Sequence, residues 1–223
     1  MNKYGVVIVA GGVGKRMGSS IPKQYLTIKN TPIIAWTIRA FYDWNKNLDI
    51  VIVISKEMQD VFQEIKDQFL PDITISTVFG GKERFHSVQN GVRACKAEII
   101  GIHDAVRPLV NNKTLETCYS TAEKLGNAIP FIPSGNSLRW KEGDQSKALD
   151  RSKVVQIQTP QCFTRKLINQ GLEQEFSENF TDDASVVEAM GMEVNLVEGN
   201  FENIKITSPV DLKIAAALLP DKF

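Results

Sequence analysis

This sequence has no excess of charge of one sign, and it has no long apolar run. The 26 lysines and arginines are balanced by 26 aspartates and glutamates, so the formal net charge is zero. A balanced charge gives no support to nucleic acid or an anionic membrane as the main partner. No apolar run approaches the ~20 residues of a membrane-spanning helix, and the run at residues 5–10 is too short for a secretory signal. We therefore expect a cytoplasmic protein that binds neither nucleic acid nor membrane.

Cysteine and histidine are scarce as well. The three cysteines are scattered and form no Cys-x-x-Cys pair, and the two histidines, His86 and His103, lie far apart in the sequence. This pattern argues against a zinc site and indicates a reducing compartment. A chain of 223 residues can bury a core without disulfides, and we expect one domain over residues 1–223.

Short apolar runs alternate along the chain with segments of helical period. The unbroken β-branched run at residues 5–10 predicts a strand buried on both faces, and residues 49–55 predict a second buried strand. Further strands are predicted at residues 73–78 and 98–104. Helices are predicted at residues 31–44, 58–69, 83–95, 113–125, 164–175 and 183–190, with a strand near 192–198 and a last helix from Pro209. Thr31 is the predicted N-cap of the first helix, with Pro32 at its first position. The alternation predicts an α/β fold with a mostly parallel sheet.

Residues 134–153 interrupt this pattern, because they are polar and carry one large aromatic side chain, Trp140. We interpret them as an arm that projects from the domain, built as a β-hairpin. A surface loop without regular structure is the alternative.

The glycine-rich stretch that follows the first strand does not fit two well-known nucleotide motifs. Met17 stands where a dinucleotide fingerprint has its third glycine, and Ser55 ends the second strand where an acidic residue would bind a ribose. A Walker A loop fails too, because Arg16 follows Lys15 and Val9 occupies the position of the earlier glycine. These mismatches disfavour a nicotinamide-dependent oxidoreductase and a P-loop enzyme.

The same stretch nevertheless has the chemistry of a phosphate cradle. Glycines let backbone N–H groups approach phosphate oxygens, and Arg16 and Lys23 bring two cations to the same place. Two cations and a metal ion can offset the charge that builds up at a phosphorus atom under attack. A tight strand–helix turn with solvated basic residues is the alternative. In an open α/β sheet the ligand lies beyond the carboxyl ends of the strands, so we expect residues 10–25, 79–87 and 103–108 to line the site.

Several motifs in this chain resemble those of one family. AGGVGKRMGSSIPKQY (10–25) is similar to the signature of the sugar nucleotidyltransferases, and it is followed in order by GGKERFHSV (80–88), HDAVRP (103–108), DR (150–151), QTPQCF (158–163), TDDAS (181–185) and NIKIT (203–207). Within that superfamily the set is most similar to the 2-C-methyl-D-erythritol 4-phosphate cytidylyltransferase family, over nearly the whole chain. The resemblance implies a Rossmann-like, three-layer α/β/α nucleotidyltransferase fold whose arm makes the contact between two subunits.

The family condenses CTP with 2-C-methyl-D-erythritol 4-phosphate, giving 4-diphosphocytidyl-2-C-methyl-D-erythritol and pyrophosphate in the non-mevalonate isoprenoid pathway. The attacking phosphate is already an anion, so positioning and charge neutralisation suffice for catalysis. The resemblance implies that Arg16 and Lys23 stabilise the transition state, with Asp104 and Lys205 as further catalytic residues. It also implies Mg²⁺ bridging the CTP phosphates, with Asp104 as a weak protein ligand.

The resemblance further implies where the nucleotide binds. The residues expected to contact CTP are Ala10, Gly11, Gly12, Gly14, Gly81, Lys82, Arg84 and Ser87. Backbone groups of Ala10 and Gly11 would exclude a purine. Taken alone, GGKER could equally be a strand–helix turn, Asp104 could be a helix N-cap, and His103 reads as a hydrogen-bonded structural residue.

The second substrate, a sugar-alcohol phosphate, needs cations and hydroxyl partners of its own. The matching family positions are Arg107, Ser137, Arg151, Thr181 and Lys205. In the family the arm reaches the neighbouring subunit, so Arg151 would complete the partner's site in a homodimer. The sequence departs from the family where the arm carries Asn136 and Ser137 in place of Asp-Thr, although Ser137 keeps the hydroxyl.

Two alternative functions stay open on the sequence. A ribitol-5-phosphate or other polyol-phosphate cytidylyltransferase would share the cradle and the HDAVRP motif, whereas TDDAS and LDRSK favour methylerythritol phosphate. A nucleotide-binding module without catalytic activity is the remote alternative. The intact Arg16, Lys23 and Asp104 argue against that module.

Overall fold

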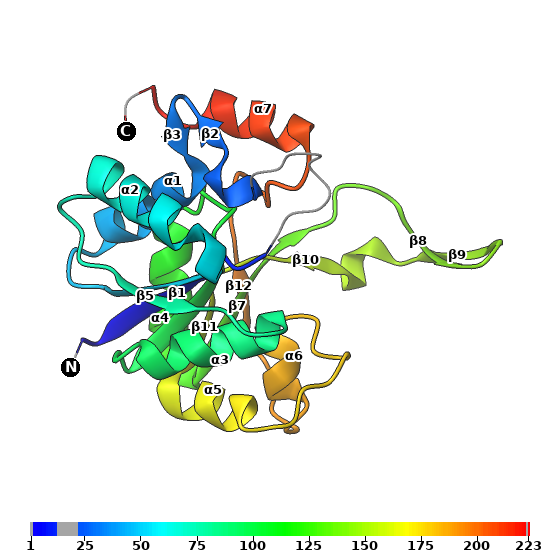
Figure 1. Ribbon diagram of the computed structural model, residues 1–223. Coiled ribbons are helices and arrows are strands. Elements are labelled where there is room, and N and C mark those ends of the chain that lie inside the picture. Colours follow the sequence, from blue (N-terminus) through cyan, green and yellow to red (C-terminus); the bar gives the residue numbers. More distant parts are fainter. Residues whose placement is uncertain (1, 13–21, 222) are drawn as a thin grey trace.

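The computed structural model describes residues 2–12, 22–221 and 223, and its centre is a twisted sheet (Figure 1). Within the described chain, eight strands form this sheet in the order β10-β7-β11-β6-β1-β4-β5, with β12 paired to β7. The strands are β1 (Tyr4–Val9), β4 (Asp49–Ile54), β5 (Ser76–Phe79), β6 (Ile99–Asp104), β7 (Asn127–Pro133), β10 (Val155–Ile157), β11 (Gln161–Thr164) and β12 (Leu196–Glu198). The β1–β4, β1–β6, β4–β5 and β7–β12 pairs are parallel, whereas β10 and β11 pair antiparallel with their neighbours. The predicted α/β fold with a mostly parallel sheet is confirmed.

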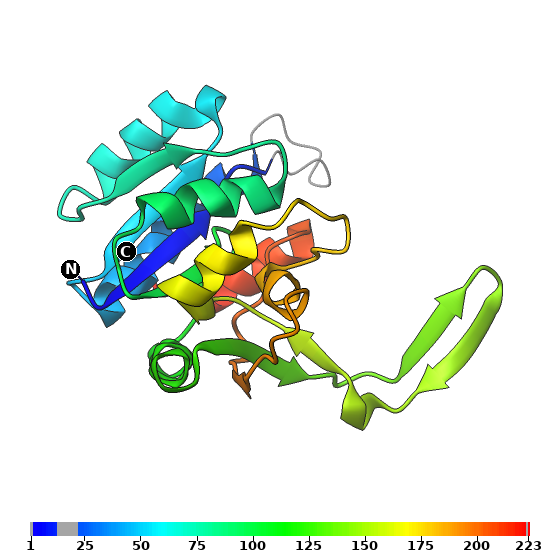
Figure 2. The same ribbon diagram turned by 90° about the horizontal axis from the view of Figure 1, so that it is seen from below.

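Helices cover both faces of the sheet, as Figure 2 shows from below. They are α1 (Ile33–Trp44), α2 (Gln59–Phe69), α3 (Arg84–Ala94), α4 (Asn112–Leu125), α5 (Arg165–Leu172), α6 (Asp183–Glu188) and α7 (Pro209–Leu218), with short 3-10 helices η2 (Lys23–Tyr25), η3 (Lys56–Met58) and η4 (Arg151–Lys153). Buried side chains of α1, α2 and α4 pack on one face, and those of α3, α5 and α6 pack on the other. This is the predicted three-layer arrangement.

The strand β1 shows why the layers form. Val6 and Ile8 belong to the core under α1, α2 and α4, whereas Val7 between them belongs to the core under α3, α5 and α6. Successive side chains of a strand point to opposite faces, so an unbroken apolar strand needs a helical layer on each side. The two cores therefore lie on opposite faces of one sheet.

Three predicted boundaries were wrong. Thr31 is not the N-cap of the first helix: Thr31–Pro32 forms strand β3, which pairs with β2 (Thr27–Ile28), and the helix begins at Ile33 with Pro32 as its N-cap. Lys29 and Asn30, at φ of 52° and 64°, make the tight turn that ties Thr31 into this hairpin. The third predicted strand begins only at Ser76, and the predicted strand near 192–198 is paired only at 196–198.

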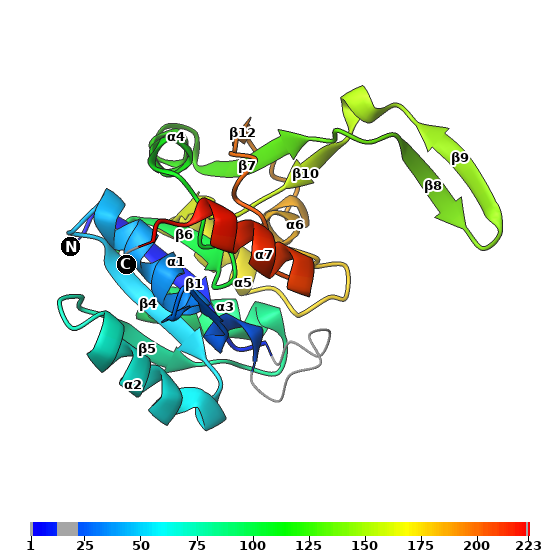
Figure 3. The same ribbon diagram turned by 90° about the horizontal axis from the view of Figure 1, so that it is seen from above.

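The arm is a hairpin that extends away from the rest of the chain (Figure 3). Strands β8 (Leu138–Glu142) and β9 (Gln145–Leu149) pair antiparallel with each other in a sheet of their own, and Gly143 occupies the turn at a φ of 55°. The predicted β-hairpin is therefore confirmed. Trp140 on the arm is 62% exposed, which leaves a large aromatic surface open to solvent. None of the helices in the described ranges is long and apolar enough to cross a membrane.

Candidate active site

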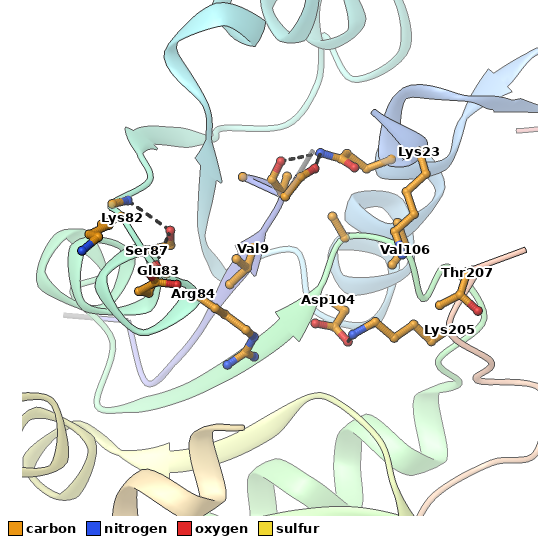
Figure 4. Close-up of a pocket in the computed structure, with 16 residues that line it drawn as sticks. Val9, Lys23, Lys82, Glu83, Arg84, Ser87, Asp104, Val106, Lys205 and Thr207 are labelled. Atoms are coloured by element: carbon orange, nitrogen blue, oxygen red, sulfur yellow. Dashed lines mark hydrogen bonds and ion pairs between the residues drawn. The ribbon is translucent and has the colours of Figure 1, made fainter. Parts of the chain in front are cut away.

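A cavity of about 520 Å³ opens at the carboxyl ends of β1 and β6 (Figure 4). It is lined by residues from three loops and from the chain before α7: Val9, Ala10, Gly11, Gly12, Lys23, Gln24, Gly81, Lys82, Glu83, Arg84, Ser87, Asp104, Ala105, Val106, Lys205 and Thr207. The three loops are those that the sequence predicted. Residues 13–21 lie outside the described chain, so the predictions for Gly14 and Arg16 concern residues whose structure is not described.

Asp104 carries the negative charge at the centre of the cavity. Its carboxylate Oδ2 lies 3.0 Å from Lys205 Nζ and 3.3 Å from Arg107 Nε. Burial alone would raise the pKa of Asp104, but Lys205, Arg84 and Arg107 together hold that pKa well below its usual range. The three neighbouring cations therefore favour the anionic form of Asp104.

The chain at 203–207 places Lys205 against this carboxylate. The amide of Ile206 donates to the Val106 carbonyl at 3.0 Å, and Arg107 Nη1 donates to the Asn203 carbonyl at 2.8 Å. These bonds hold the NIKIT segment along the HDAVRP loop, although the two are about a hundred positions apart in the sequence. Arg107 itself is not among the cavity-lining residues, so the predicted substrate contact of Arg107 stays a prediction.

The first turn of α3 forms the opposite wall. Ser87 Oγ accepts a hydrogen bond from the Gly81 amide at 3.1 Å and donates to the Glu83 carbonyl at 3.2 Å, which fixes the turn ahead of the helix. Arg84 reaches from this turn to α6, where Nη1 and Nη2 donate to the two carboxylate oxygens of Asp183 at 2.8 and 2.6 Å. In Figure 4 the Arg84 side chain extends towards Asp104, whereas Lys82 lies on the far side of the cavity from Lys23.

Magnesium fits this site as an ion held mostly by substrate. Within the described ranges no three His, Cys, Asp or Glu side chains gather as a metal-binding group. Asp104 is the carboxylate at the cavity centre, and both of its ion pairs are made by Oδ2. Mg²⁺ in phosphoryl-transfer enzymes is commonly held by one or two carboxylates and the substrate phosphates. Asp104 Oδ1 is suited to that role.

His103 is a structural residue, as the sequence suggested. It is fully buried, its Nε2 lies 3.0 Å from the Arg107 carbonyl, and its Nδ1 lies 3.0 Å from Thr159 Oγ1. The carbonyl can only accept, so Nε2 carries the proton and Nδ1 accepts from the threonine hydroxyl. Burial lowers the pKa of His103 to about 4, so the ring is neutral and takes no proton from a substrate near neutral pH.

This depressed pKa predicts an acid-sensitive fold. The unfolded chain binds a proton at the histidine near pH 6.5, whereas the folded chain does so only near pH 4. The stability from the neutral ring is thus complete above about pH 6.5 and is lost as pH falls towards 4, by up to about 3 kcal/mol. Urea unfolding at pH 7.0 and 4.5 measures the loss. We expect His103→Gln to lose less than the wild type over this interval, and an equal loss in both proteins would contradict the assignment.

The structure brings together most of the predicted site residues that it describes. The cavity is lined by the predicted Ala10, Gly11, Gly12, Lys23, Gly81, Lys82, Arg84, Ser87, Asp104 and Lys205. Ser137 and Arg151 lie on the arm and at its base, where Arg151 Nη1 donates to the Gly135 carbonyl at 3.2 Å. Neither of them lines the cavity of the same chain, and Thr181 does not either, although it directly precedes Asp182 and the Arg84 partner Asp183. Their substrate contacts stay predictions.

Sequence reasoning did not name Gln24, which lines the cavity, or Asp183, which pairs with the cavity residue Arg84. The Gln24 residue is 3% exposed. Asp183 does not line the cavity but forms an ion pair with Arg84. Gln24 stands in the PKQY motif directly after Lys23, and Asp183 stands in TDDAS, so both lay inside motifs already singled out. The motifs alone did not show which partner each side chain contacts.

Comparisons with known proteins agree on one family. Residues 4–221 match the family model described as "IspD: 2-C-methyl-D-erythritol 4-phosphate cytidylyltransferase". Proteins of that name from Bacteroides thetaiotaomicron and Bacteroides fragilis are 43% and 44% identical to this chain, over 97% and 96% of it and 100% and 98% of their own lengths. The crystal structure of 4-diphosphocytidyl-2C-methyl-D-erythritol synthase from Anaerococcus prevotii superposes with a TM-score of 0.82 at 27% identity, covering 97% of this chain and 95% of the other.

Proposed function

Because the chain belongs to the 2-C-methyl-D-erythritol 4-phosphate cytidylyltransferase family, we propose that the cavity is its CTP site and that Lys23, Arg84 and Lys205 supply the charge for the reaction. The enzyme condenses CTP with 2-C-methyl-D-erythritol 4-phosphate and releases pyrophosphate, a step of isoprenoid biosynthesis. A ribitol-phosphate acceptor is not favoured. The observation that carries the proposal is the convergence of three cations from separate segments on one cavity with Asp104 in its wall.

The geometry suits an in-line attack by one phosphate on another. Both reactants are anions, so the first task of the site is to offset their charge. Lys23 and Arg16 act on the triphosphate, and Lys205, held by Asp104, faces the phosphate of the second substrate. The acceptor phosphate is already ionised, so no side chain has to remove a proton, in agreement with the neutral, buried His103. When bound, Mg²⁺ supplies further neutralisation of the triphosphate charge, and Asp104 would hold it.

In this proposal the arm of a neighbouring subunit completes the binding site for the second substrate. The hairpin extends away from the rest of the chain (Figure 3), and its strands pair only with each other within the described chain. None of its residues is among those that line the cavity. An exposed Trp140 and the cation of Arg151 on such an arm fit a role in a second copy of the chain. We propose a homodimer in which Arg151 and Ser137 contact the sugar phosphate in the partner's cavity, and Thr181 and Arg107 contact it from the cavity's own chain.

A cytoplasmic location completes the proposal. The three cysteines are free and buried, which fits a reducing compartment.

The arm assignment predicts a selective defect. In Arg151→Ala we expect KM for methylerythritol phosphate to rise at least ~10-fold while KM for CTP changes less than ~2-fold, because losing a charge-assisted contact costs about 1.5–3 kcal/mol. Pyrophosphate release with CTP and Mg²⁺ measures both constants, with ribitol 5-phosphate as the comparison acceptor. Lys147→Ala, on an exposed part of the same hairpin, is the matched control. A rise confined to the KM for CTP would contradict the assignment.

Mixing two impaired variants, assayed with methylerythritol phosphate well below the wild-type KM, separates action within one chain from action across the dimer. Lys23→Ala removes a cation from the phosphate site and leaves the arm unchanged. Arg151→Ala removes the cation of the arm and leaves the phosphate site unchanged. If the arm serves the partner, one site of each mixed dimer is intact. Random exchange of subunits should then restore activity towards a quarter of the wild-type value. No gain on mixing, with subunit exchange verified by mass, would show that the arm does not act across the interface.

A further inference from the structure

We propose that Gln24 is a positioning residue that fixes Lys23 relative to the start of the glycine-rich segment. The inference rests on the proposed role of Lys23 in the same site. It concerns a residue that has no charge and carries out no chemical step.

The amide of Gln24 joins two parts of the cavity wall. Its Nε2 donates to the Ala10 carbonyl at 2.6 Å and to the Gly12 carbonyl at 3.0 Å, and the side chain is only 3% exposed. A side-chain amide has two N–H donors, so one nitrogen can serve both carbonyls. Ala10 and Gly12 follow strand β1, whereas Gln24 lies in η2, directly after Lys23.

These bonds determine what the glycine-rich segment presents to an anionic ligand. Backbone N–H groups attract phosphate oxygens, whereas a carbonyl oxygen facing them repels. The Ala10 amide donates to the Val53 carbonyl at 2.7 Å, and the Ala10 carbonyl accepts from Gln24, so the backbone of this residue is held on both sides. The same Gln24 nitrogen also donates to the Gly12 carbonyl, so this oxygen too is engaged in a hydrogen bond within the chain.

The bonds also fix η2, which is too short to fix itself. Its backbone bonds are local: the Tyr25 amide donates to the Pro22 carbonyl at 2.9 Å, and the Leu26 amide donates to the Lys23 carbonyl at 3.1 Å. Gln24 adds contacts to residues 12 and 14 positions earlier in the chain. The backbone of Lys23 is therefore fixed in position relative to the end of β1. Its side chain extends into the cavity from this fixed backbone position.

The test compares two replacements of similar size. Gln24→Met removes both donors, and we expect kcat to fall by about 10- to 100-fold, the loss that follows a displacement of about 1 Å at a catalytic group. KM for methylerythritol phosphate should stay within ~2-fold of the wild-type value, because Gln24 contacts none of the residues assigned to that substrate. Thermal unfolding confirms that the variant is folded.

Gln24→Glu gives a readout that a purely structural role would not move. An ionised carboxylate opposite two carbonyls cannot donate, but a protonated carboxyl group can donate to one of them. Burial favours the protonated form, so turnover relative to the wild type at the same pH should recover at least ~3-fold between pH 8 and pH 6. If Gln24→Glu does not fold, Gln24→Met still decides the question through kcat.

Gln174 provides the matched control, because its Nε2 also donates to two backbone carbonyls, those of Gly171 and Val186, each at 2.9 Å and outside the cavity. Gln174→Met and Gln174→Glu should keep kcat within ~2-fold of wild type at every pH. The proposal is overturned if Gln24→Met retains wild-type kcat, or if folded Gln24→Glu shows the same fraction of wild-type turnover at every pH. Normal turnover in Lys23→Ala would instead overturn the proposed role of Lys23. Failure of the Gln24 proposal can therefore be told apart from failure of the proposed function.

Discussion

We expect Lys23→Ala to lose more than ~100-fold in kcat with the fold intact, the scale seen when one preorganised charge-stabilising donor is removed. Lys23 lines the cavity from η2, opposite the wall formed by the first turn of α3. Negative charge builds up on the oxygens around the phosphorus atom as the new bond forms. An ammonium group that is already in place stabilises this charge without having to move. KM for CTP should change less than kcat, because the contact strengthens in the transition state. Steady-state pyrophosphate release measures both constants.

The control for this result is an exposed lysine that lies away from the cavity. Lys56 in η3 is exposed and does not line the cavity, so Lys56→Ala should keep kcat within ~2-fold of wild type. Arg16→Ala should fall as far as Lys23→Ala, since the sequence assigns both cations to the same phosphates. A folded Lys23→Ala enzyme with near-normal kcat would remove the central cation from the proposed mechanism.

The main elements of the fold could be predicted because burial leaves a clear pattern in the sequence. An unbroken run such as GVVIVA can only be a strand covered on both faces, and β1 is that strand. The first helix was placed too early because its start depends on the turn at Lys29 and Asn30. Both residues have positive φ. Asparagine is common in that conformation, but lysine is not, so the pair Lys29-Asn30 gives only a weak signal for a hairpin turn.

The site could be predicted to the level of loops and motifs, but not of contacts. The carboxyl ends of β1 and β6 had to meet at one edge of the sheet, so the glycine-rich stretch and Asp104 could be expected together. The pairing of Asp104 with Lys205 depends on how the chain returns from α6, which local sequence does not determine. The two hydrogen bonds of Gln24 and the ion pair of Arg84 with Asp183 could not be predicted either, because they too join segments that are distant in the sequence.

Arg84→Met should destabilise the fold by about 3 kcal/mol at neutral pH, because it leaves the carboxylate of Asp183 buried without a counter-charge. The Asp183 side chain is 2% exposed and that of Arg84 is 36% exposed. Because Arg84 is partly solvated, the expected loss in free energy of unfolding lies at the lower end of the range for buried ion pairs. Burial raises the pKa of Asp183 even beside Arg84, and without the guanidinium it should rise further. Folded Arg84→Met then binds a proton more tightly than the unfolded chain does. Its deficit relative to the wild type should shrink as pH falls from 8 to 5, as measured by urea unfolding.

The reverse deletion should cost less, and that asymmetry tests the argument. Asp183→Asn leaves a guanidinium that is already partly solvated and lines an open cavity, so the free energy of unfolding should fall by less than in Arg84→Met. The double variant Arg84→Met/Asp183→Asn removes both charges and should recover much of the loss of Arg84→Met. Equal losses in the two single variants would contradict the predicted asymmetry, and a double variant equal to their sum would mean that the pair is not coupled. Coupling at this position would join the wall of the nucleotide cavity to the TDDAS segment, so that one buried ion pair aligns α3 with the residue predicted to bind the acceptor, Thr181.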